Sequence, residues 1–395
     1  MNILVVNVGS TSLKYTLYRE GTALARGKVQ RIGVPGTHLA HRASSGETFA
    51  ETGDRLSYED AIRRMLDLLE STGDMADTGT LDAVGFKVVH GGRVSGTVRL
   101  TPEVVDEMEA YNLVAPAHNP PYVDAIRLFA RVAPGVPLVG VFETGFHATL
   151  PAHVYTYGVP LEWQERYGIR RYGFHGASHG YIARRTQELL GEGLRVISCH
   201  LGGSSSVCAI ASGRSMDVSM GYSPQGGPPQ SSRCGDLDAF VALRLLQTGA
   251  YSVEELARVL TVESGLKGIS GVGGDLRDLE EAAAGGNERA RLALDCFVYE
   301  IRKLIGAYTA ALEGVDVIVF TGGIGENGVD VRARVLAGFE FIGLELDAAA
   351  NAAVRGREGR ISADGSHVQV WVLPTDEELV VAGSVAEFLA SGGAA

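Results

Sequence analysis

The sequence predicts an α/β protein made of two duplicated halves, and three observations support this prediction. Strand-like and helix-like segments alternate along the chain, which is typical of the α/β class. Residues 3–18 and 194–210 look like copies of each other, because each reads as an apolar β-branched strand, a turn rich in Gly and Ser, and a second strand. The chain has 395 residues, which favours two domains over one.

The first half begins with one of these strand pairs, expected to be antiparallel over residues 3–6 and 15–18. Ser57 is expected to cap a helix, because apolar residues then follow it at helical spacing. Pro120 and Pro121 argue against regular structure at their own positions. The other expected elements are strands at 83–89 and 137–142 and helices at 104–111 and 123–132.

The second half opens with a loop-rich stretch that includes residues 170–185, where Gly176 and Gly180 argue against a helix. The boundary between the halves is expected near residues 146–151, and the last helix is expected to fold back onto the first half. The other expected elements are the second strand pair, a Gly-, Pro- and Ser-rich loop at 220–236, the longest helix at 287–312, strands at 315–320 and 368–373, and a closing helix from 379.

Composition and charge exclude several classes of protein. The chain is 45% hydrophobic and 21% charged, so it can bury real cores and is not expected to be disordered. A net charge of −12 argues against nucleic-acid binding, although a local group of Arg and Lys can still bind an anionic substrate. The sequence shows no N-terminal leader and no apolar run near the roughly 20 residues that span a bilayer. We therefore expect no nucleic-acid or membrane partner and a cytoplasmic location.

The two duplicated turns are candidates for phosphate binding. A tight glycine turn exposes backbone N–H groups, and neighbouring hydroxyls add further donors. The first turn carries Ser10 and Ser12 and is flanked by Asn7 and Lys14. The alternative is an ordinary solvated hairpin turn. Two such turns about one domain length apart favour two halves that face one polyphosphate.

Several other polar residues lie in loops or at strand ends. Gly322 and Gly323 follow a buried strand, as at nucleotide sites, but glycine pairs are also common in ordinary turns. Arg233 suits a carboxylate or phosphate, with a solvated arginine as the alternative. Glu143 and Glu377 are carboxylates of the kind that holds Mg²⁺.

Histidines and cysteines give a weaker signal. Four histidines in Gly- or Pro-punctuated loops predict at least one active-site histidine, and their spacing does not resemble a zinc site. The four cysteines form no CxxC pair, which predicts free thiols. The histidines are His90, His118, His175 and His179, and the cysteines are Cys199, Cys208, Cys234 and Cys296.

Motifs along nearly the whole chain resemble the acetate kinase family, within the acetate and sugar kinase/Hsp70/actin superfamily. They are, in the family's order, NVGSTSLKY, VVHGG, APAHNPP, YGFHGASH, CHLG, SMGYSP, RCGDLD, SGVGGDLRDLE, FTGGIGEN and PTDEEL. The resemblance implies two duplicated RNase H-like (actin-like ATPase) domains with an inter-domain cleft. The implied domains are residues 1–148 with 379–395, and a nucleotide-binding domain over 149–378.

The resemblance also implies roles for individual residues, a Mg²⁺ or Mn²⁺ cofactor, ATP as phosphoryl donor and a homodimer. The implied catalytic residues are His175, Arg233 and Glu143, and the implied metal ligands are Asn7 and Glu377. The implied binding residues for the small carboxylate are Lys87, Val89, Ala117, His118, Phe174 and Pro224. The implied nucleotide- and phosphate-binding residues are Asn7, Ser10, Ser12, Lys14, His200, Gly202, Gly203, Ser204, Asp275, Arg277, Gly323, Ile324 and Asn327.

The chain departs from the family at several of these positions. Lys87 replaces an arginine and Glu143 replaces the catalytic aspartate, so a bidentate donor is lost and a carboxylate is one methylene longer. Gly203 and Ser204 stand where the family has Asn and Gly, and Ala117 replaces a bulky leucine. The SMGYSP segment also lacks the family's PxEGL continuation.

The sequence therefore predicts a Mg²⁺-dependent kinase that moves the γ-phosphoryl group of ATP reversibly to acetate or propionate. Such transfer depends mainly on positioning and on neutralising charge. Two alternatives stay open: a carboxylate kinase that uses pyrophosphate or another donor, and a nucleotide-binding homologue without catalysis. Ala117 predicts a larger acyl pocket than a strict acetate enzyme would have.

Overall fold

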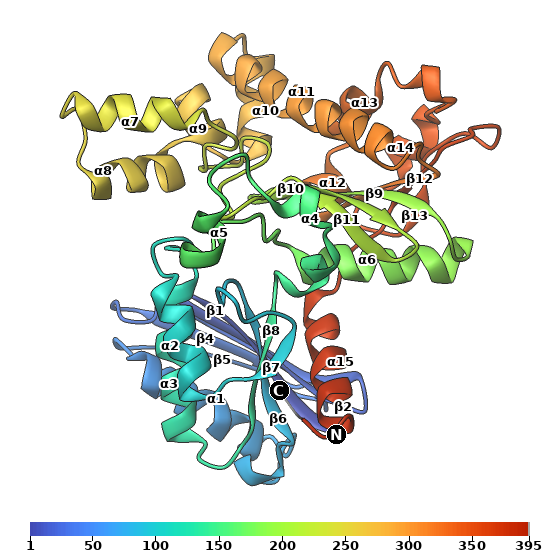
Figure 1. The fold of residues 1–395 in the computed structure, drawn as a ribbon. Helices are drawn as coiled ribbons and strands as arrows, with labels where there is room; N and C mark the ends of the chain where they lie inside the picture. The colour runs from blue at the N-terminus through green and yellow to red at the C-terminus, as the bar shows by residue number, and fades with distance from the viewer. Residues whose placement is uncertain (394–395) are drawn as a thin grey trace. The chain divides into compact units, whose positions relative to one another are not determined.

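The computed structural model describes residues 1–393, which form two compact units. Unit 1 runs from Met1 to Ala148 and again from Asp376 onward, and unit 2 spans Thr149–Thr375. Each unit is built on one β-sheet with helices on both faces (Figure 1). Among the described residues, no helix has the length and apolar character needed to cross a membrane.

Unit 1 contains an eight-stranded sheet in the order β5-β4-β3-β2-β1-β6-β8-β7. β1 pairs antiparallel with β2 and parallel with β6, which in turn is parallel to β8. The strands are β1 (Asn2–Gly9), β2 (Ser12–Arg19), β3 (Thr22–Gln30), β4 (Thr37–Arg42), β5 (Thr48–Gly53), β6 (Ala83–Val88), β7 (Thr97–Arg99) and β8 (Leu138–Phe142).

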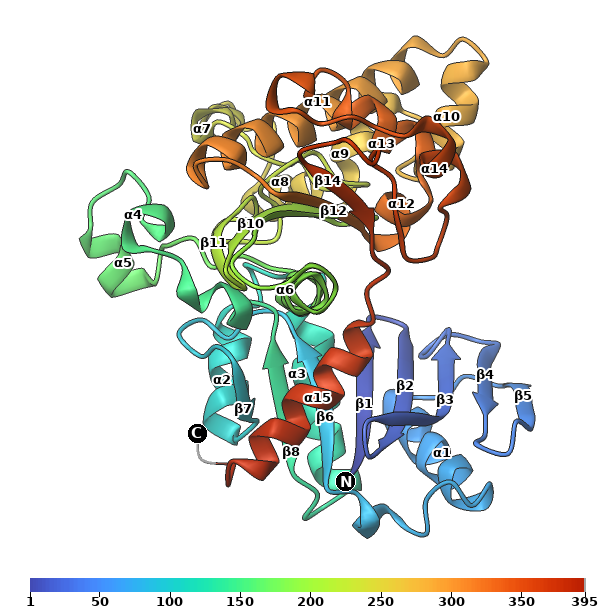
Figure 2. The same cartoon turned by 90° about the vertical axis from the view of Figure 1, so that its right-hand side faces the viewer.

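Helices cover both faces of this sheet. α1 (Tyr58–Ser71) and α3 (Asn119–Val132) pack on one face, with α2 (Pro102–Ala110) against α3. α15 (Glu377–Ala390) crosses the other face over β1, β6 and β8 (Figure 2). Because side chains alternate along a strand, Leu4 and Val6 of β1 belong to the core under α1 and α3, while Ile3 and Val5 pack with α15.

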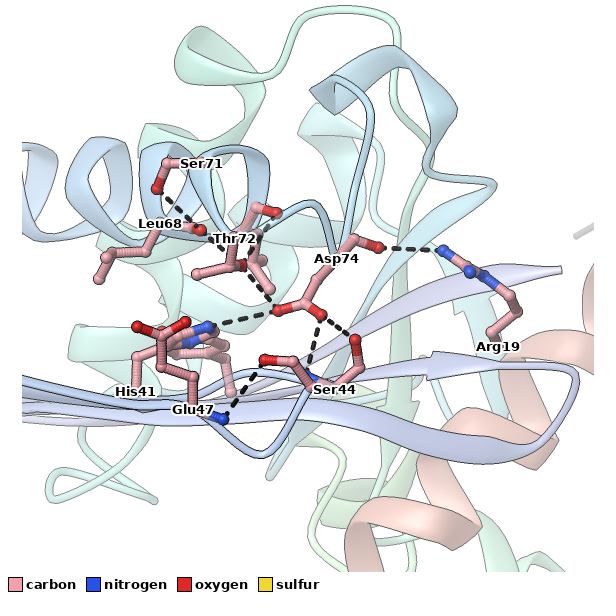
Figure 3. Close-up of polar contacts among 11 residues, drawn as sticks. Arg19, His41, Ser44, Glu47, Leu68, Ser71, Thr72 and Asp74 are labelled. Carbon is pink, nitrogen blue, oxygen red and sulfur yellow. Dashed lines mark hydrogen bonds and ion pairs between the residues drawn. The ribbon is translucent and has the colours of Figure 1, made fainter.

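A buried polar cluster ties the end of α1 to the sheet of unit 1 (Figure 3). Asp74 accepts hydrogen bonds from the Ser44 amide at 2.9 Å and from Thr72 Oγ1 at 2.7 Å. His41 Nε2 lies 3.4 Å from Asp74 Oδ2, and His41 Nδ1 lies 2.8 Å from the hydroxyl of Tyr15. Burial alone would raise the pKa of Asp74, but these hydrogen bonds outweigh burial and lower it. The cluster therefore adds polar contacts among α1, β2 and β4 to the apolar core that these elements share.

Unit 2 contains a six-stranded sheet in the order β11-β10-β9-β12-β14-β13. α6 packs on β9 from one face, and α11, joined by α9 and α10, covers the other. The strands are β9 (Arg195–Leu201), β10 (Ser205–Ala211), β11 (Arg214–Val218), β12 (Val317–Thr321), β13 (Gly359–Arg360) and β14 (Gln369–Val372). The helices are α4 (Ala152–Tyr155), α5 (Glu162–Tyr167), α6 (Gly176–Leu190), α7 (Ala239–Gln247), α8 (Val253–Arg258), α9 (Gly265–Ser270), α10 (Leu276–Ala284), α11 (Glu288–Ala311), α12 (Gly322–Asn327), α13 (Val329–Leu336) and α14 (Ala348–Ala353).

The two sheets repeat one topology, which confirms the predicted duplication. In each, a hairpin (β1–β2 or β9–β10) is followed by a third antiparallel strand at its outer edge, β3 or β11. On the other side the first hairpin strand continues into two parallel strands, β6 and β8 or β12 and β14. The Ser57 cap and the longest helix are also confirmed, and all four cysteines are free.

Three expectations about helices were wrong. Pro120 and Pro121 lie inside the first turn of α3, where a helix does not use the N–H groups that proline lacks. Gly176 and Gly180 lie within α6, because packing against β9 overrides their low helix propensity. α15 begins at Glu377 rather than 379, because the Asp376 side chain caps the amide of Leu379, and unit 1 accordingly resumes at Asp376.

Candidate active site

The carboxyl ends of three parallel strands, β1, β6 and β8, lie at one edge of the unit 1 sheet. Lys87 is the next-to-last residue of β6, and Glu143 follows β8 directly. Lys87 Nζ is 3.5 Å from Oε1 of Glu143 and makes a closer ion pair with Oε2 of Glu377, the first residue of α15. Three predicted site residues from distant parts of the sequence therefore meet at this edge.

Tyr122 connects Asn7, a predicted metal ligand, to this group. Its hydroxyl donates to Asn7 Oδ1 at 2.9 Å and accepts from the Val8 amide at 3.2 Å. Burial raises the pKa of Tyr122 to about 12, and the nearby Lys87 ammonium acts in the opposite direction. Sequence reasoning missed this residue, because a tyrosine one turn into an amphipathic helix gives no signal beyond burial.

Charge neutralisation dominates this edge of unit 1. Burial opposes the charge of Lys87, but the carboxylates of Glu143 and Glu377 outweigh it and hold the pKa of the ammonium above its usual value. The Glu143 side chain is only 4% exposed. Lys87 and Glu143 are also the two residues expected to depart from the family's arginine and aspartate. The structure places these two side chains in contact with each other.

The predicted first phosphate loop is the turn between β1 and β2. Ser10 and Lys14 are exposed, and Ser12 is half-buried. The hydroxyl of Tyr58, from α1, donates to the carbonyl oxygens of Gly9 and Ser12, the latter at 2.9 Å. Tyr58 therefore holds the turn through its backbone carbonyl oxygens, and the side chains of Ser10 and Lys14 remain exposed to solvent.

Unit 2 gathers three histidines where α6 meets β9 and β10. His175 is the N-cap of α6 and has a φ of 58°, a left-handed conformation that costs a non-glycine residue on the order of 1 kcal/mol. Its ring stacks on that of His200, with 4.2 Å between ring centroids. His179, one turn further along α6, is fully buried. Strained backbone at the residue predicted to contact the phosphoryl group supports a functional constraint at this position.

Arg233 lies beside the second duplicated turn. Its Nη1 donates to Ser204 Oγ at 3.0 Å and to Gln230 Oε1 at 3.3 Å, and burial lowers the pKa of the guanidinium. Gln230 is fully buried, accepts the Ser204 hydroxyl at 2.8 Å and donates to the Pro224 carbonyl at 2.9 Å. Gln230 was not predicted, and it is the residue that holds Ser204, Arg233 and Pro224 in one arrangement.

A pocket of about 540 Å³ opens in unit 2 at the ends of β9 and β12. A side chain at Gly323 would meet nothing within 4 Å, so this glycine leaves room above the backbone rather than relieving a clash. Ser231, Glu280 and Arg355 also line the pocket and were not predicted. The predicted nucleotide residues that line it are Gly202, Gly203, Asp275, Arg277, Gly323, Ile324 and Asn327. Their role in nucleotide binding stays a prediction.

A fully buried arginine, Arg332 of α13, supports this pocket from within unit 2. Burial lowers its pKa to about 10, which leaves it charged at neutral pH. Two of its acceptors belong to α12, the helix that presents Gly323 and Asn327 to the pocket. The acceptors, at 2.8–2.9 Å, are Asn351 Oδ1 and the carbonyl oxygens of Gly325, Glu326, Asn351 and Val354.

The residues predicted to wall the acyl pocket are divided between the units. Unit 1 carries Val89, which is buried, His118, which is half-buried, and Ala117, which is exposed. Unit 2 carries Phe174 and Pro224, both buried. Their common role as one pocket therefore stays a prediction.

Comparison with known proteins gives matches along nearly the whole chain. The profile of the Acetokinase family matches residues 2–383. The acetate kinase of Halothermothrix orenii is 43% identical over 399 residues, covering 99% of this chain and 100% of that protein. The acetate kinase of Bacillus subtilis is 43% identical over 389 residues, covering 97% and 98%.

Solved structures of two kinases have the same fold. The Porphyromonas gingivalis acetate kinase superposes with a TM-score of 0.88 at 39% identity, covering 98% of this chain and 99% of that one. A propionate kinase from Francisella tularensis superposes with a TM-score of 0.89 at 31% identity, covering 97% and 98%.

The duplicated fold and these matches together define a phosphotransferase whose acceptor is a carboxyl group. Such an enzyme has to bring two anions together, and cations stand among the predicted site residues of both units, Lys87 in one and Arg233 in the other. This chain belongs to the acetokinase family.

Proposed function

We propose that this protein transfers the γ-phosphoryl group of ATP to acetate or propionate, giving an acyl phosphate and ADP, and that it also runs the reverse reaction. The observation that carries the proposal is the match to acetate and propionate kinases over the full length, at about 43% identity to curated acetate kinases. These matches give no support to a pyrophosphate-dependent or a non-catalytic protein.

The reaction calls for charge neutralisation more than for a base. A carboxylate is already a nucleophile, so attack on the γ-phosphorus needs alignment and cations that lower the repulsion between two anions. Lys87 is proposed to bind the acceptor carboxylate, with Glu143 fixing its position through the 3.5 Å contact. Arg233 and His175 are proposed to stabilise the phosphoryl group during transfer.

The oxygen donors of unit 1 suit Mg²⁺ bound to a nucleotide. Asn7 offers an amide oxygen and Glu377 a carboxylate, both hard ligands. Among residues 1–393, no three His, Cys, Asp or Glu side chains form a closed metal cage. This donor set matches an ion that keeps several waters and takes its other ligands from substrate phosphates. When bound, such an ion neutralises phosphate charge; Asn7 and Glu377 would hold it.

An activity matrix tests the proposal. The purified protein is incubated with Mg²⁺ and either ATP or pyrophosphate, and with acetate, propionate or butyrate, and acyl phosphate is trapped as the hydroxamate. We expect product with ATP only, and, from Ala117, similar kcat/KM for acetate and propionate. A steep preference for acetate would reject the enlarged pocket, and ATP binding without product would reject the proposed reaction.

We also propose a homodimer that forms through α7. No residue of this apolar helix is buried in a single chain, and Phe240 is 76% exposed and Leu243 56%. An apolar helix without a buried face needs a partner surface, and an identical copy supplies a self-complementary one. Phe240→Glu is expected to halve the mass measured by light scattering, whereas Phe341→Glu, at an equally exposed phenylalanine (77%), should leave the dimer intact. A monomeric wild type would reject the dimer.

A cytoplasmic location is proposed on chemical grounds. The four free thiols suit a reducing compartment, and the ATP that the reaction consumes is made available there.

A further inference from the structure

A chain of hydrogen bonds leads from His175 into the interior of unit 2. His175 Nδ1 lies 2.8 Å from Ser206 Oγ, and the same hydroxyl lies 2.8 Å from Nε2 of His179. His179 Nδ1 lies 2.9 Å from Ser198 Oγ. Four side chains, alternately imidazole and hydroxyl, are thus connected in one line.

The sheet explains why these groups face one another. Side chains of β9 and β10 alternate, so Ser198 and Ser206 point toward α6 while Ile197 and Val207 enter the core on the opposite face. Ser198, Ser206 and His179 are all fully buried. Burying a polar group costs desolvation free energy unless the group is hydrogen-bonded. The hydrogen bonds along this line offset that cost, and they fix the positions of the four side chains.

The direction of the hydrogen bonds decides which nitrogen of His175 carries a proton. A neutral imidazole donates from one nitrogen and accepts at the other, and a serine hydroxyl donates once. If Ser198 donates to His179 Nδ1, then His179 Nε2–H donates to Ser206, and Ser206 donates to His175 Nδ1. His175 then carries its proton on Nε2. The reversed line would place that proton on Nδ1 and would leave the buried Ser198 hydroxyl hydrogen without an acceptor, since His179 Nδ1 is the one partner of Ser198 Oγ among the described residues.

The stacked ring of His200 completes the arrangement. Its centroid lies 4.2 Å from that of His175 with the planes at 29°, and its own Nδ1 lies 2.8 Å from the hydroxyl of Ser178. The stack restricts the plane of the His175 ring, and the Ser206 contact restricts its rotation in that plane. Neither contact uses Nε2 of His175.

We propose that Ser206 and His179 are positioning residues that hold His175 in the tautomer with the proton on Nε2, so that this N–H donates to the phosphoryl group in transfer. The inference rests on the proposed function in that it takes His175 as a phosphoryl-contacting residue. A donor fixed before substrate arrives avoids reorganisation during the reaction. A tautomer-fixing partner one step behind a catalytic histidine is worth roughly 10- to 100-fold or more in rate.

The test combines imidazole ¹⁵N NMR with steady-state kinetics. The ¹⁵N shifts distinguish protonated from unprotonated ring nitrogens, and the His175 signals are assigned by their loss in His175→Gln. In the wild type we expect a protonated Nε2 and an unprotonated Nδ1. Ser206→Ala should mix the two tautomers and lower kcat roughly 10-fold or more while changing either KM less than about 3-fold. Ser206→Thr, which keeps the hydroxyl, should preserve the wild-type tautomer and most of kcat.

Ser215→Ala is the matched control, because Ser215 is also fully buried in the same sheet, its hydroxyl lies 3.5 Å from the Cys208 thiol, and it is not a member of the line from His175 to Ser198. It should leave both readouts unchanged. A wild-type His175 protonated on Nδ1 overturns the inference, whether or not the variants fold, and so does a Ser206→Ala enzyme with normal kcat or a Ser215→Ala enzyme that loses as much. A wild type with the expected tautomer but no kinase activity would reject the proposed function instead.

Discussion

Each unit has one cation beside its predicted site, the half-buried Lys87 in unit 1 and the fully buried Arg332 in unit 2, and the two cations have different kinds of partner. In unit 1, Lys87 faces the carboxylates of Glu143 and Glu377. In unit 2, Arg332 faces five oxygens that carry no formal charge. The Lys87 ammonium can exchange a carboxylate partner for an anionic substrate. The Arg332 guanidinium is bound to backbone carbonyl oxygens, two of them in α12, and cannot change these partners without disrupting that helix. We therefore propose that Lys87 acts in the reaction itself and that Arg332 holds the residues of the pocket in place.

Removing the unit 1 cation should have the largest effect on catalysis. Lys87→Met leaves two carboxylates side by side with no cation, so the acceptor carboxylate would be repelled rather than bound. We expect kcat/KM for acetate to fall about 10³-fold. Steady-state assays measure this, and the KM for ATP is the internal control: an equal loss for ATP would mean that Lys87 acts on the fold rather than on the acceptor.

Removing the unit 2 cation should act mainly on stability and on ATP. Arg332→Met leaves buried carbonyl oxygens without donors, which should lower the free energy of unfolding by about 3 kcal/mol. The KM for ATP should rise while the KM for acetate changes little. Urea unfolding and the two KM values test this, and Arg332→Lys, which keeps charge but loses the fork, should fall between wild type and Arg332→Met. A larger effect on acetate than on ATP would contradict the division of roles.

A double-mutant cycle tests whether Lys87 and Glu143 of unit 1 act together. Because Lys87 and Glu143 are in contact, Lys87→Arg and Glu143→Asp should each lower kcat, and the double variant should recover part of the loss. We expect a coupling energy of about 1–2 kcal/mol from the double-mutant cycle. Strictly additive losses would show that the two departures from the family do not compensate.

The smallest expected effect concerns the backbone surface of unit 2. Gly203 stands where the resemblance implies an Asn, and a Cβ atom added there would have one neighbour within 4 Å, Ser231 Oγ at 3.6 Å. Gly203→Asn should therefore fold with an unchanged Tm and lower the KM for ATP by about 2- to 5-fold, the gain of a single hydrogen bond. A drop in Tm would mean that the glycine is needed by the turn itself.

The sequence alone predicted several helices and strands that depend on local sequence patterns. The two hairpins, the Ser57 cap and the helix from Asn287 follow from periodicity and capping residues, and the structure has them. Strands β3, β4, β5 and β11 and helices α7–α10, α13 and α14 were not predicted. Prolines at α3 and glycines at α6 led to wrong predictions, because first-turn geometry and packing on β9 override local preference there.

The contacts within the site could not be predicted, because they join residues that are far apart in the chain. The Lys87–Glu377 ion pair spans 290 positions, and Gln230 and Tyr122 have no motif that marks them. Motifs named many of the candidate residues, but only the fold shows that Lys87 and Glu143 are in contact.

The position of α15 affects how the protein folds during translation. α15 covers the face of the unit 1 sheet that Ile3, Val5 and Val139 form. Its first residue, Glu377, makes the ion pair with Lys87. During synthesis that apolar surface therefore stays unshielded until residues 377–390 have been made. A chain that lacks residues 376–390 would expose this apolar face and would lose the carboxylate that pairs with Lys87.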